Sequence, residues 1–263
     1  MATGRHAPQP AFVLHQWDWS ETSLILDLFT RDRGRLAVVA KGAKRPYSQL
    51  RPVLMPFQRL LVLTSQPKSD AGADILNLRS AEYAGGGATL PAARLFTGFY
   101  LNELLLKALA RGDPHERLFD AYADRVGALV DAADEAPLRA FELLLLREIG
   151  LLPELGRCTP TQAAVQADGR YQLQPEAGLV PAAGEPALAG ACCLALQSAL
   201  DRDDRPALRR ACQADLPALK AQLRAVLHYH LGSPPLRTRQ LMLDLRRLLD
   251  APPPPAATAP ASR

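Results

Sequence analysis

Cysteine is scarce in this sequence of 263 residues, and its few copies form no recognisable set. Neighbouring cysteines seldom pair with each other, and no CxxC occurs, so the sequence indicates neither a disulfide framework nor a four-ligand zinc site. The five histidines do not cluster with the cysteines along the chain. We therefore expect no metal and no cofactor. The four cysteines are Cys158, Cys192, Cys193 and Cys212.

Long apolar runs are missing as well. No stretch of eighteen uncharged apolar residues exists, and the first residues lack the basic start and apolar segment of a secretory signal. A hydrophobic content of 48% with 22% charged residues is ordinary for a globular protein. We expect a cytoplasmic protein that does not bind a membrane.

Signatures of catalysis are also absent. The sequence contains no GxxxxGK[ST], no GxSxG and no HExxH. Gly85, Gly86 and Gly87 have no lysine partner, so a hinge is a better interpretation than a phosphate cradle. Glu142 and Glu148 lie in an apolar helical pattern and are expected on its solvated face. We expect no enzyme; an enzyme with a helical lid stays an alternative, which would need acid, base or nucleophile residues converging in a pocket.

Positive charge, in contrast, is concentrated in one part of the chain. Residues 1–80 hold eleven Lys and Arg against six Asp and Glu, whereas residues 81–263 hold 20 against 21. Residues 31–59 alone contain eight basic side chains and the single acid Asp32. A functionless basic face usually keeps its charges interspersed with acids. Such a local excess is what a nucleic-acid surface requires.

Five short strand patterns fill the first eighty residues. Leu24, Leu26 and Leu28 alternate with more polar neighbours, and the turn at 31–34 joins this run to the next as a hairpin. Five strands without a convincing helix favour a small closed barrel, of which the OB-fold is the common form and a frequent binder of single strands. The expected strands are Phe12–Leu14, Thr22–Phe29, Leu36–Ala40, Gln58–Thr64 and Ile75–Glu82.

After residue 87 the apolar period changes to that of helices. Asp113, Pro114 and Glu116 are expected at the N-cap, N1 and N3 positions of the second helix. The expected helices are 91–111, 114–130, 136–149, 187–200, 206–212, 216–231 and 236–249. Residues 151–186 are irregular, with a small hairpin expected around Asp168 and Gly169. Residues 251–263 are rich in Pro and Ala and are expected to be disordered.

The fold class that follows is α+β with more than one domain. Residues 1–82 are expected to form a five-stranded, nucleic-acid-binding OB-fold barrel. Residues 88–250 are expected to form a mostly α-helical domain with an irregular insertion at about 151–186.

The basic stretch at 31–51 carries the candidate binding residues. If Leu36 and Val38 face the barrel core, strand alternation points Arg35 and Lys41 outward together. Gly42 then lets a backbone approach the basic loop closely. Long basic side chains on a strand and its loop can follow a phosphate backbone. The candidates are Arg31, Arg33, Arg35, Lys41, Lys44, Arg45, Tyr47 and Arg51.

Aromatic side chains near this stretch are candidates for stacking on bases. Tyr47 lies inside the basic window, and Trp17 and Trp19 lie in the preceding loop. For these three, a place in the core and a place on the surface are about equally favoured. The aromatic residues expected in the core are Phe12, Phe29 and Phe57.

Several longer phrases occur in a characteristic order. They are "ETSLILDLFTRDRGRLAVVAKGAKRP", "LMPFQRLLV", "GFYLNELLLKAL", "DPHERLFDAY" and "LRAFELLLLREIGLLPEL", with weaker matches at "PEAGLV" and "HYHLGSPPLRTRQLM". Through these phrases the chain resembles the RecO family of bacterial recombination mediators. The resemblance runs from about Phe12 to Leu155 and resumes near the C-terminus.

The resemblance implies an N-terminal OB-fold and a helical domain without ATPase activity. It implies binding of single- and double-stranded DNA, annealing of complementary strands, and a role in recombinational repair at the nucleoid. The implied partners are RecR, the C-terminal tail of the single-strand-binding protein SSB and, indirectly, RecA. An OB-fold RNA-binding protein is the alternative, because stacking and phosphate contacts are common to both.

Two details of the family are harder to carry over to this chain. A groove for the acidic, apolar SSB tail needs an apolar pocket rimmed by basic residues. The candidates are Lys107, Arg139 and Arg147, and a solubilising role is the competing interpretation.

Many members also carry a zinc module of two Cys pairs. Here Thr161 stands where the partner of Cys158 is expected, so the module is expected to be metal-free.

Overall fold

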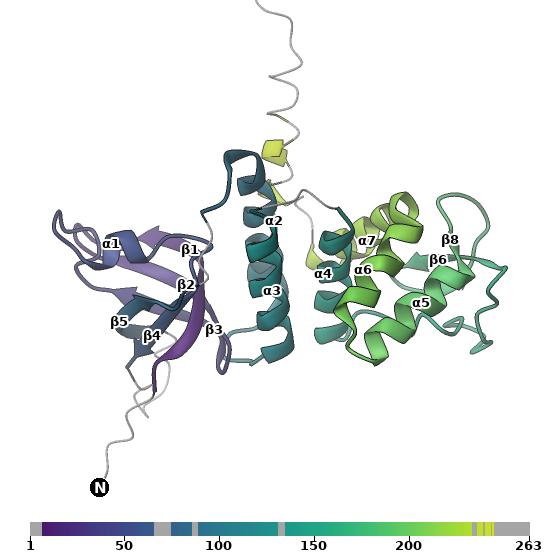
Figure 1. Ribbon diagram of the computed structural model, residues 1–263, viewed down its shortest axis with the longest axis horizontal. Coiled ribbons are helices and arrows are strands. Elements are labelled where there is room, and N and C mark those ends of the chain that lie inside the picture. The colour runs from purple at the N-terminus through teal and green to yellow at the C-terminus, as the bar shows by residue number, and fades with distance from the viewer. Residues whose placement is uncertain are drawn as a thin grey trace, which may run out of the picture.

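The computed structural model describes residues 7–65, 75–85, 89–130, 135–232, 236–238, 240–242 and 244. The strands of the first eighty residues lie at one end of the molecule (Figure 1). Helices α2 and α3 stand in the middle, and α4 to α7 with a small sheet lie at the other end. The expected helix 236–249 is described only in part, and the expected disordered tail lies outside the described residues.

The five N-terminal strands close into a barrel in the order β1-β2-β3-β5-β4. All neighbouring pairs are antiparallel except β3 with β5. This confirms the expected five-stranded barrel with a hairpin between its second and third strands. The strands are β1 Gln9–Asp18, β2 Leu24–Thr30, β3 Gly34–Ala40, β4 Leu60–Thr64 and β5 Ile75–Tyr83. A four-residue helix that the sequence did not suggest, α1 Leu50–Val53, connects β3 to β4.

The two faces of the barrel wall are both buried in part, but against different neighbours. Leu26, Leu28 and Val38 are fully buried in the barrel interior. Phe12 and Phe29 point to the outside of the same wall, where their rings pack on the helical domain. The expectation that these phenylalanines are core residues is confirmed. The core they join, however, is that of the helices.

A polar contact accompanies this packing. Asn102 is buried in α2 (Ala92–Ala108) and donates a hydrogen bond of 2.9 Å to the carbonyl of Leu14 in β1. Tyr122 of α3 (Glu116–Ala128) donates one of 2.6 Å to the Asn102 amide oxygen. Buried polar groups need such partners, so the bonds fix the position of the barrel on the two helices.

Helix α3 begins later than its sequence signature indicates. His115, and not Asp113, is the residue before its first turn, and Pro114 lies outside the helix. Its other end agrees with the expected range to within two residues. The remaining helices are α4 Glu135–Glu148, α5 Gly190–Asp201, α6 Arg205–Ala214 and α7 Leu216–Leu231.

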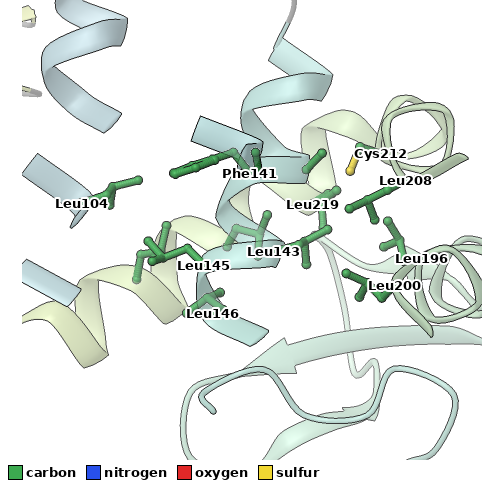
Figure 2. Packing of buried hydrophobic residues seen from close by; sticks show 14 of the residues in the cluster. Leu104, Phe141, Leu143, Leu145, Leu146, Leu196, Leu200, Leu208, Cys212 and Leu219 are labelled. Carbon is green, nitrogen blue, oxygen red and sulfur yellow. The ribbon is translucent and has the colours of Figure 1, made fainter. Parts of the chain in front are cut away.

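Helix α4 lies at the centre of the helical domain. Its residues Phe141, Leu143 and Leu146 are surrounded by apolar side chains of α2, α5, α6 and α7 (Figure 2). Glu142 is also fully buried, so its expected place on a solvated face is wrong. It accepts a hydrogen bond of 2.6 Å from Tyr100 and pairs with Arg139 at 3.0 Å. Burial raises the pKa of Glu142.

A small three-stranded sheet, in the order β7-β6-β8, lies partly in the irregular segment and partly just after it, where β8 takes the place expected for the start of a helix. Its strands are β6 Arg170–Gln174, β7 Gly178–Pro181 and β8 Leu188–Ala189. The hairpin turn therefore lies at residues 175–177, later than the expected Asp168 and Gly169, which precede β6.

All four cysteines are buried with free thiols. Burial raises the pKa of Cys192 to about 11 and that of Cys212 to about 12. Among the residues that the structure describes, no three His, Cys, Asp or Glu side chains converge as metal ligands. Within the same ranges, no helix combines the length and apolar character needed to cross a bilayer.

Candidate nucleic-acid interface

The tip of the β2–β3 hairpin is docked on the helical domain. Gly34 has a φ of +64°, and a side chain at this position would overlap the carbonyl of Asp113 in the α2–α3 connection. The N–H of Gly112 donates a hydrogen bond of 2.9 Å to the carbonyl of Arg35. The first basic residues of the candidate stretch are therefore close to the helices instead of free in solvent.

Arg31 is held by acidic residues of α3. Its guanidinium donates two hydrogen bonds of 3.1 Å to the two carboxylate oxygens of Asp120. A second contact, of 2.7 Å, joins it to Glu116. Two parallel hydrogen bonds between a guanidinium and a carboxylate fix the relative orientation of both side chains. The positive charge of Arg31 is thus compensated within the protein.

The side chain of Arg35 is more buried than that of Arg31. Its side chain is only 15% exposed and lies 3.1 Å from the buried carboxylate of Asp27. The same guanidinium donates hydrogen bonds to the carbonyls of Leu106 and Leu109, which end helix α2. Arg111 approaches Asp27 from the other side at 3.7 Å. Burial nevertheless outweighs the two cations and raises the pKa of Asp27.

These contacts give the hairpin a structural role, and its expected contact with DNA stays a prediction. Arg35 does point outward from the barrel, as alternation predicts, but the outer wall is covered there by α2. The Arg33 guanidinium donates a hydrogen bond of 3.1 Å to the hydroxyl of Thr64, the last residue of β4. Arg31 and Arg35 therefore join the two parts of the molecule, and neither offers a free charge to a ligand.

The loop after β3 has a different environment. The backbone N–H of Lys44 donates a hydrogen bond of 3.0 Å to Thr22, which ties this loop to the β1–β2 loop. The Lys44 ammonium lies 3.1 Å from Asp18 and donates a hydrogen bond of 3.2 Å to the carbonyl of Ser20. Gly42 adopts a φ of +73°, which only glycine takes without strain. Two loops from different strands thus form one surface.

Several candidates are exposed on this surface. Lys41, Arg45 and Arg51 are solvent-accessible, and Tyr47 is 94% exposed. Within the described parts of the chain, no carboxylate lies within 4.0 Å of Lys41, Arg45 or Arg51. We call the end of β1, the β1–β2 loop and the β3–β4 connection together the loop face; its exposed or partly exposed aromatic and basic residues include Trp17, Trp19, Lys41, Lys44, Arg45, Tyr47 and Arg51. Its free positive charge is the feature that a phosphate backbone requires.

The two tryptophans lie close to this charge in the chain fold: Lys44 contacts Asp18 and Ser20, the two neighbours of Trp19. Trp17 is opposite Ile25 in the β1–β2 pairing, and Ile25 is opposite Val39 in β3. Residues opposite one another in a sheet point to the same face, so Trp17 points to the outer face of the barrel wall. Trp17 is 43% exposed and Trp19 62% exposed.

The residues suggested for an SSB-tail groove do not converge. The Arg139 side chain is 8% exposed and bound to Glu142. Arg147 is exposed near Asp201, at 3.6 Å, and Lys107 lies on the separate helix α2. Sequence periodicity could not reveal that Arg139 points into the core.

A small, mostly apolar groove lies between α3, α4 and α6. Three arginines line it: Arg125 is buried, Arg205 pairs with Asp124, and Arg209 is half-buried. Because its residues come from three helices far apart in the sequence, only the helix packing brings them together. The lining residues are Ala121, Arg125, Pro137, Ala140, Phe141, Leu144, Arg205, Leu208 and Arg209.

Comparison with known proteins now identifies the family. Residues 5–82 match the family model "Recombination protein O N terminal", and residues 92–240 match "Recombination protein O C terminal". The chain belongs to the RecO family. "DNA repair protein RecO" of Verminephrobacter eiseniae (strain EF01-2) is 53% identical over 253 residues, covering 94% of this chain and 99% of the relative. The protein of the same name from Acidovorax ebreus (strain TPSY) is 53% identical over 263 residues, with 94% and 100% covered.

Proposed function

We propose that this RecO-family chain binds single- and double-stranded DNA through its loop face and anneals complementary strands. The observation that carries the proposal is the free positive charge of Lys41, Arg45 and Arg51 in the β3–β4 connection of an OB-type barrel. OB-folds bind oligonucleotides on their second and third strands and on the β1–β2 and β4–β5 loops. Lys44 lies beside the β1–β2 loop, where it contacts Asp18 and Ser20. The expected contacts of Arg31 and Arg35 with DNA are not part of this proposal, because both guanidinium groups are bound within the protein.

Annealing needs no catalytic group in this proposal. Two strands repel each other through their phosphates, and a basic surface lowers this repulsion by replacing condensed counterions. Base pairing then supplies the free energy. No step hydrolyses ATP or forms a covalent bond, so the chain acts as a mediator and not as an enzyme.

A triple substitution tests the surface. We expect Lys41→Ala, Arg45→Ala and Arg51→Ala together to weaken binding of single-stranded DNA and slow annealing. The slope of log affinity against log salt is expected to become shallower by roughly 0.7 for each phosphate that the variant no longer binds. Annealing is followed with labelled complementary strands, and the slope with titrations at several salt concentrations.

A matched variant controls for the reduction in net charge. Arg202, Arg210 and Arg224 are also exposed but lie on the helical domain, and replacing them with Ala removes the same three charges. This control is expected to bind and anneal like the wild type. Equal losses of affinity in both variants, or no loss in the first, refute the loop face as the binding surface. Tighter binding of RNA than of a matched DNA strand refutes DNA as the preferred polymer.

We further propose that the groove between α3, α4 and α6 binds the SSB tail, and that the protein acts with RecR in the cytoplasm, at the nucleoid, to load RecA. The apolar lining and the partly exposed Arg209 support an acidic, apolar peptide at this groove. Arg209→Glu is expected to weaken binding of an SSB-tail peptide, measured by fluorescence anisotropy. Arg147→Glu serves as the control outside the groove, and equal effects of the two refute this site.

A further inference from the structure

Both tryptophans of the chain lie in the loop face, and both are exposed. This is unusual, because tryptophan is highly buried on average and its exposure leaves a large apolar ring in water. Tyr47 on the adjoining loop is 94% exposed as well. Three large aromatic rings therefore accompany the free positive charge, although aromatic residues make up only 6% of the sequence.

The positions of the rings are supported by the surrounding structure. Trp17 belongs to the paired part of β1, and its ring contacts that of His15 with centroids 4.4 Å apart and planes at 77°. The N–H of Trp19 donates a hydrogen bond of 3.2 Å to the carbonyl of Ser23, which closes the loop. These contacts order the ring of Trp17 and the backbone of Trp19, and groups that are ordered before binding lose little conformational entropy when they bind a ligand.

We infer that Trp17 and Trp19 form a stacking platform for unpaired bases, so that the loop face prefers single strands to duplex. The inference rests on the proposed function and adds to it. Phosphate contacts alone do not distinguish a single strand from a duplex of similar charge. Indole rings do, since only unpaired bases expose their faces for stacking. The neighbouring charges of Lys41 and Arg45 would then follow the backbone of the same strand.

Intrinsic fluorescence offers a direct measurement, because every tryptophan of the chain is in the platform. Oligo(dT) at saturating concentration is expected to quench the emission of the wild-type protein. A strand of the same length with abasic sites throughout keeps the phosphates but has no bases, and it is expected to cause little quenching. Unchanged emission with bound oligo(dT) overturns the inference.

Variants extend the test to affinity. Trp17→Leu with Trp19→Leu is expected to lower the affinity for oligo(dT) by about tenfold or more, because the bases no longer stack on indole rings. Affinity for a blunt duplex and the salt slope are expected to stay as in the wild type. Trp17→Phe with Trp19→Phe keeps aromatic rings and is expected to restore most of the affinity.

The leucine variant also separates this inference from the proposed function. If it binds oligo(dT) like the wild type while the Lys41, Arg45 and Arg51 variant does not, the platform is refuted and the loop face stands. If the leucine variant loses duplex affinity equally, the tryptophans stabilise the loops and the inference is again refuted. If the wild-type protein binds neither oligo(dT) nor the blunt duplex, the proposed function itself fails.

Discussion

Arg31 and Asp120, 89 residues apart in the sequence, are joined by two hydrogen bonds of 3.1 Å between a guanidinium and a carboxylate. The pair connects the tip of the barrel hairpin to the middle helix of the molecule. Arg31 also contacts Glu116. A residue predicted from the sequence to bind DNA therefore takes part in a contact within the protein.

The first prediction follows from this pair. Arg31→Gln is expected to lower the melting temperature, because it leaves Asp120 and Glu116 without their cation. The affinity for single-stranded DNA is expected to fall much less than in Lys41→Ala, whose charge is free. Thermal unfolding and DNA titration at one salt concentration measure both effects. A larger drop in affinity for Arg31→Gln than for Lys41→Ala contradicts this assignment.

The second prediction concerns the docked hairpin. Gly34→Ala is expected to destabilise the protein by about 2 kcal/mol or more, because a positive φ disfavours the side chain and Asp113 occupies its space. Gly112→Ala is a matched control, with a φ of +75° and open space around the added carbon. It is expected to cost about 1 kcal/mol from backbone strain alone. Urea unfolding measures both, and equal destabilisation would contradict close docking at Gly34.

The third prediction concerns Asp18, an exposed carboxylate beside the loop face. It lies 3.1 Å from the Lys44 ammonium, so it competes with a DNA phosphate for that cation. Asp18→Asn is expected to raise the affinity for single-stranded DNA a few-fold and to steepen the salt slope by up to about 0.7, the contribution of one phosphate. Titrations at several salt concentrations measure the slope. An unchanged slope means that Lys44 makes no phosphate contact.

The fourth prediction is a pH dependence. Burial raises the pKa of Asp27 above its ordinary 3.8, so the folded state binds a proton more readily than the unfolded state. The contribution of Asp27 to the free energy of unfolding therefore falls as the pH rises from 3.8 through the folded-state pKa, and is constant above it.

Comparison with Asp27→Asn isolates this contribution. The free energy of unfolding is measured in urea from about pH 4 to about pH 8 for both proteins, a range that starts near the unfolded-state pKa. We expect the wild-type value to fall relative to that of the variant in the lower part of this range and to run parallel above it. Parallel curves throughout would show that the pKa of Asp27 is not raised.

The barrel was predictable because its interior follows strand alternation. Leu26, Leu28 and Val38 recur at every second position, and a strand has no other way to bury such a pattern. The outer wall was not predictable. The side chain of Arg35 points outward in the sequence pattern as in the structure, but the helix that covers it begins more than fifty residues later. The alternation of residue types predicts to which side of a strand each side chain points. It does not predict which other part of the chain packs against that side.

The same limit applies to the helical domain. Glu142 interrupts an apolar pattern, and sequence reasoning assigned the charge to solvent. Its partners Tyr100 and Arg139 lie on two helices, and only their packing makes a buried carboxylate tolerable. Lys41, Lys44 and Arg45 stand out in the sequence as a basic cluster in one loop, and their contact with DNA stays a prediction.

The packing of Phe12 and Phe29 on Phe119 also limits how the protein can be divided. A recombinant fragment that ends after β5 would expose both rings and would leave Asp27 with neither Arg111 nor its apolar cover. Such a fragment is expected to aggregate even though its five strands are intact. Conversely, a helical fragment would lose the rings that fill the space beside Tyr122. The barrel and the helical domain therefore share a hydrophobic core. We expect them to unfold in a single transition.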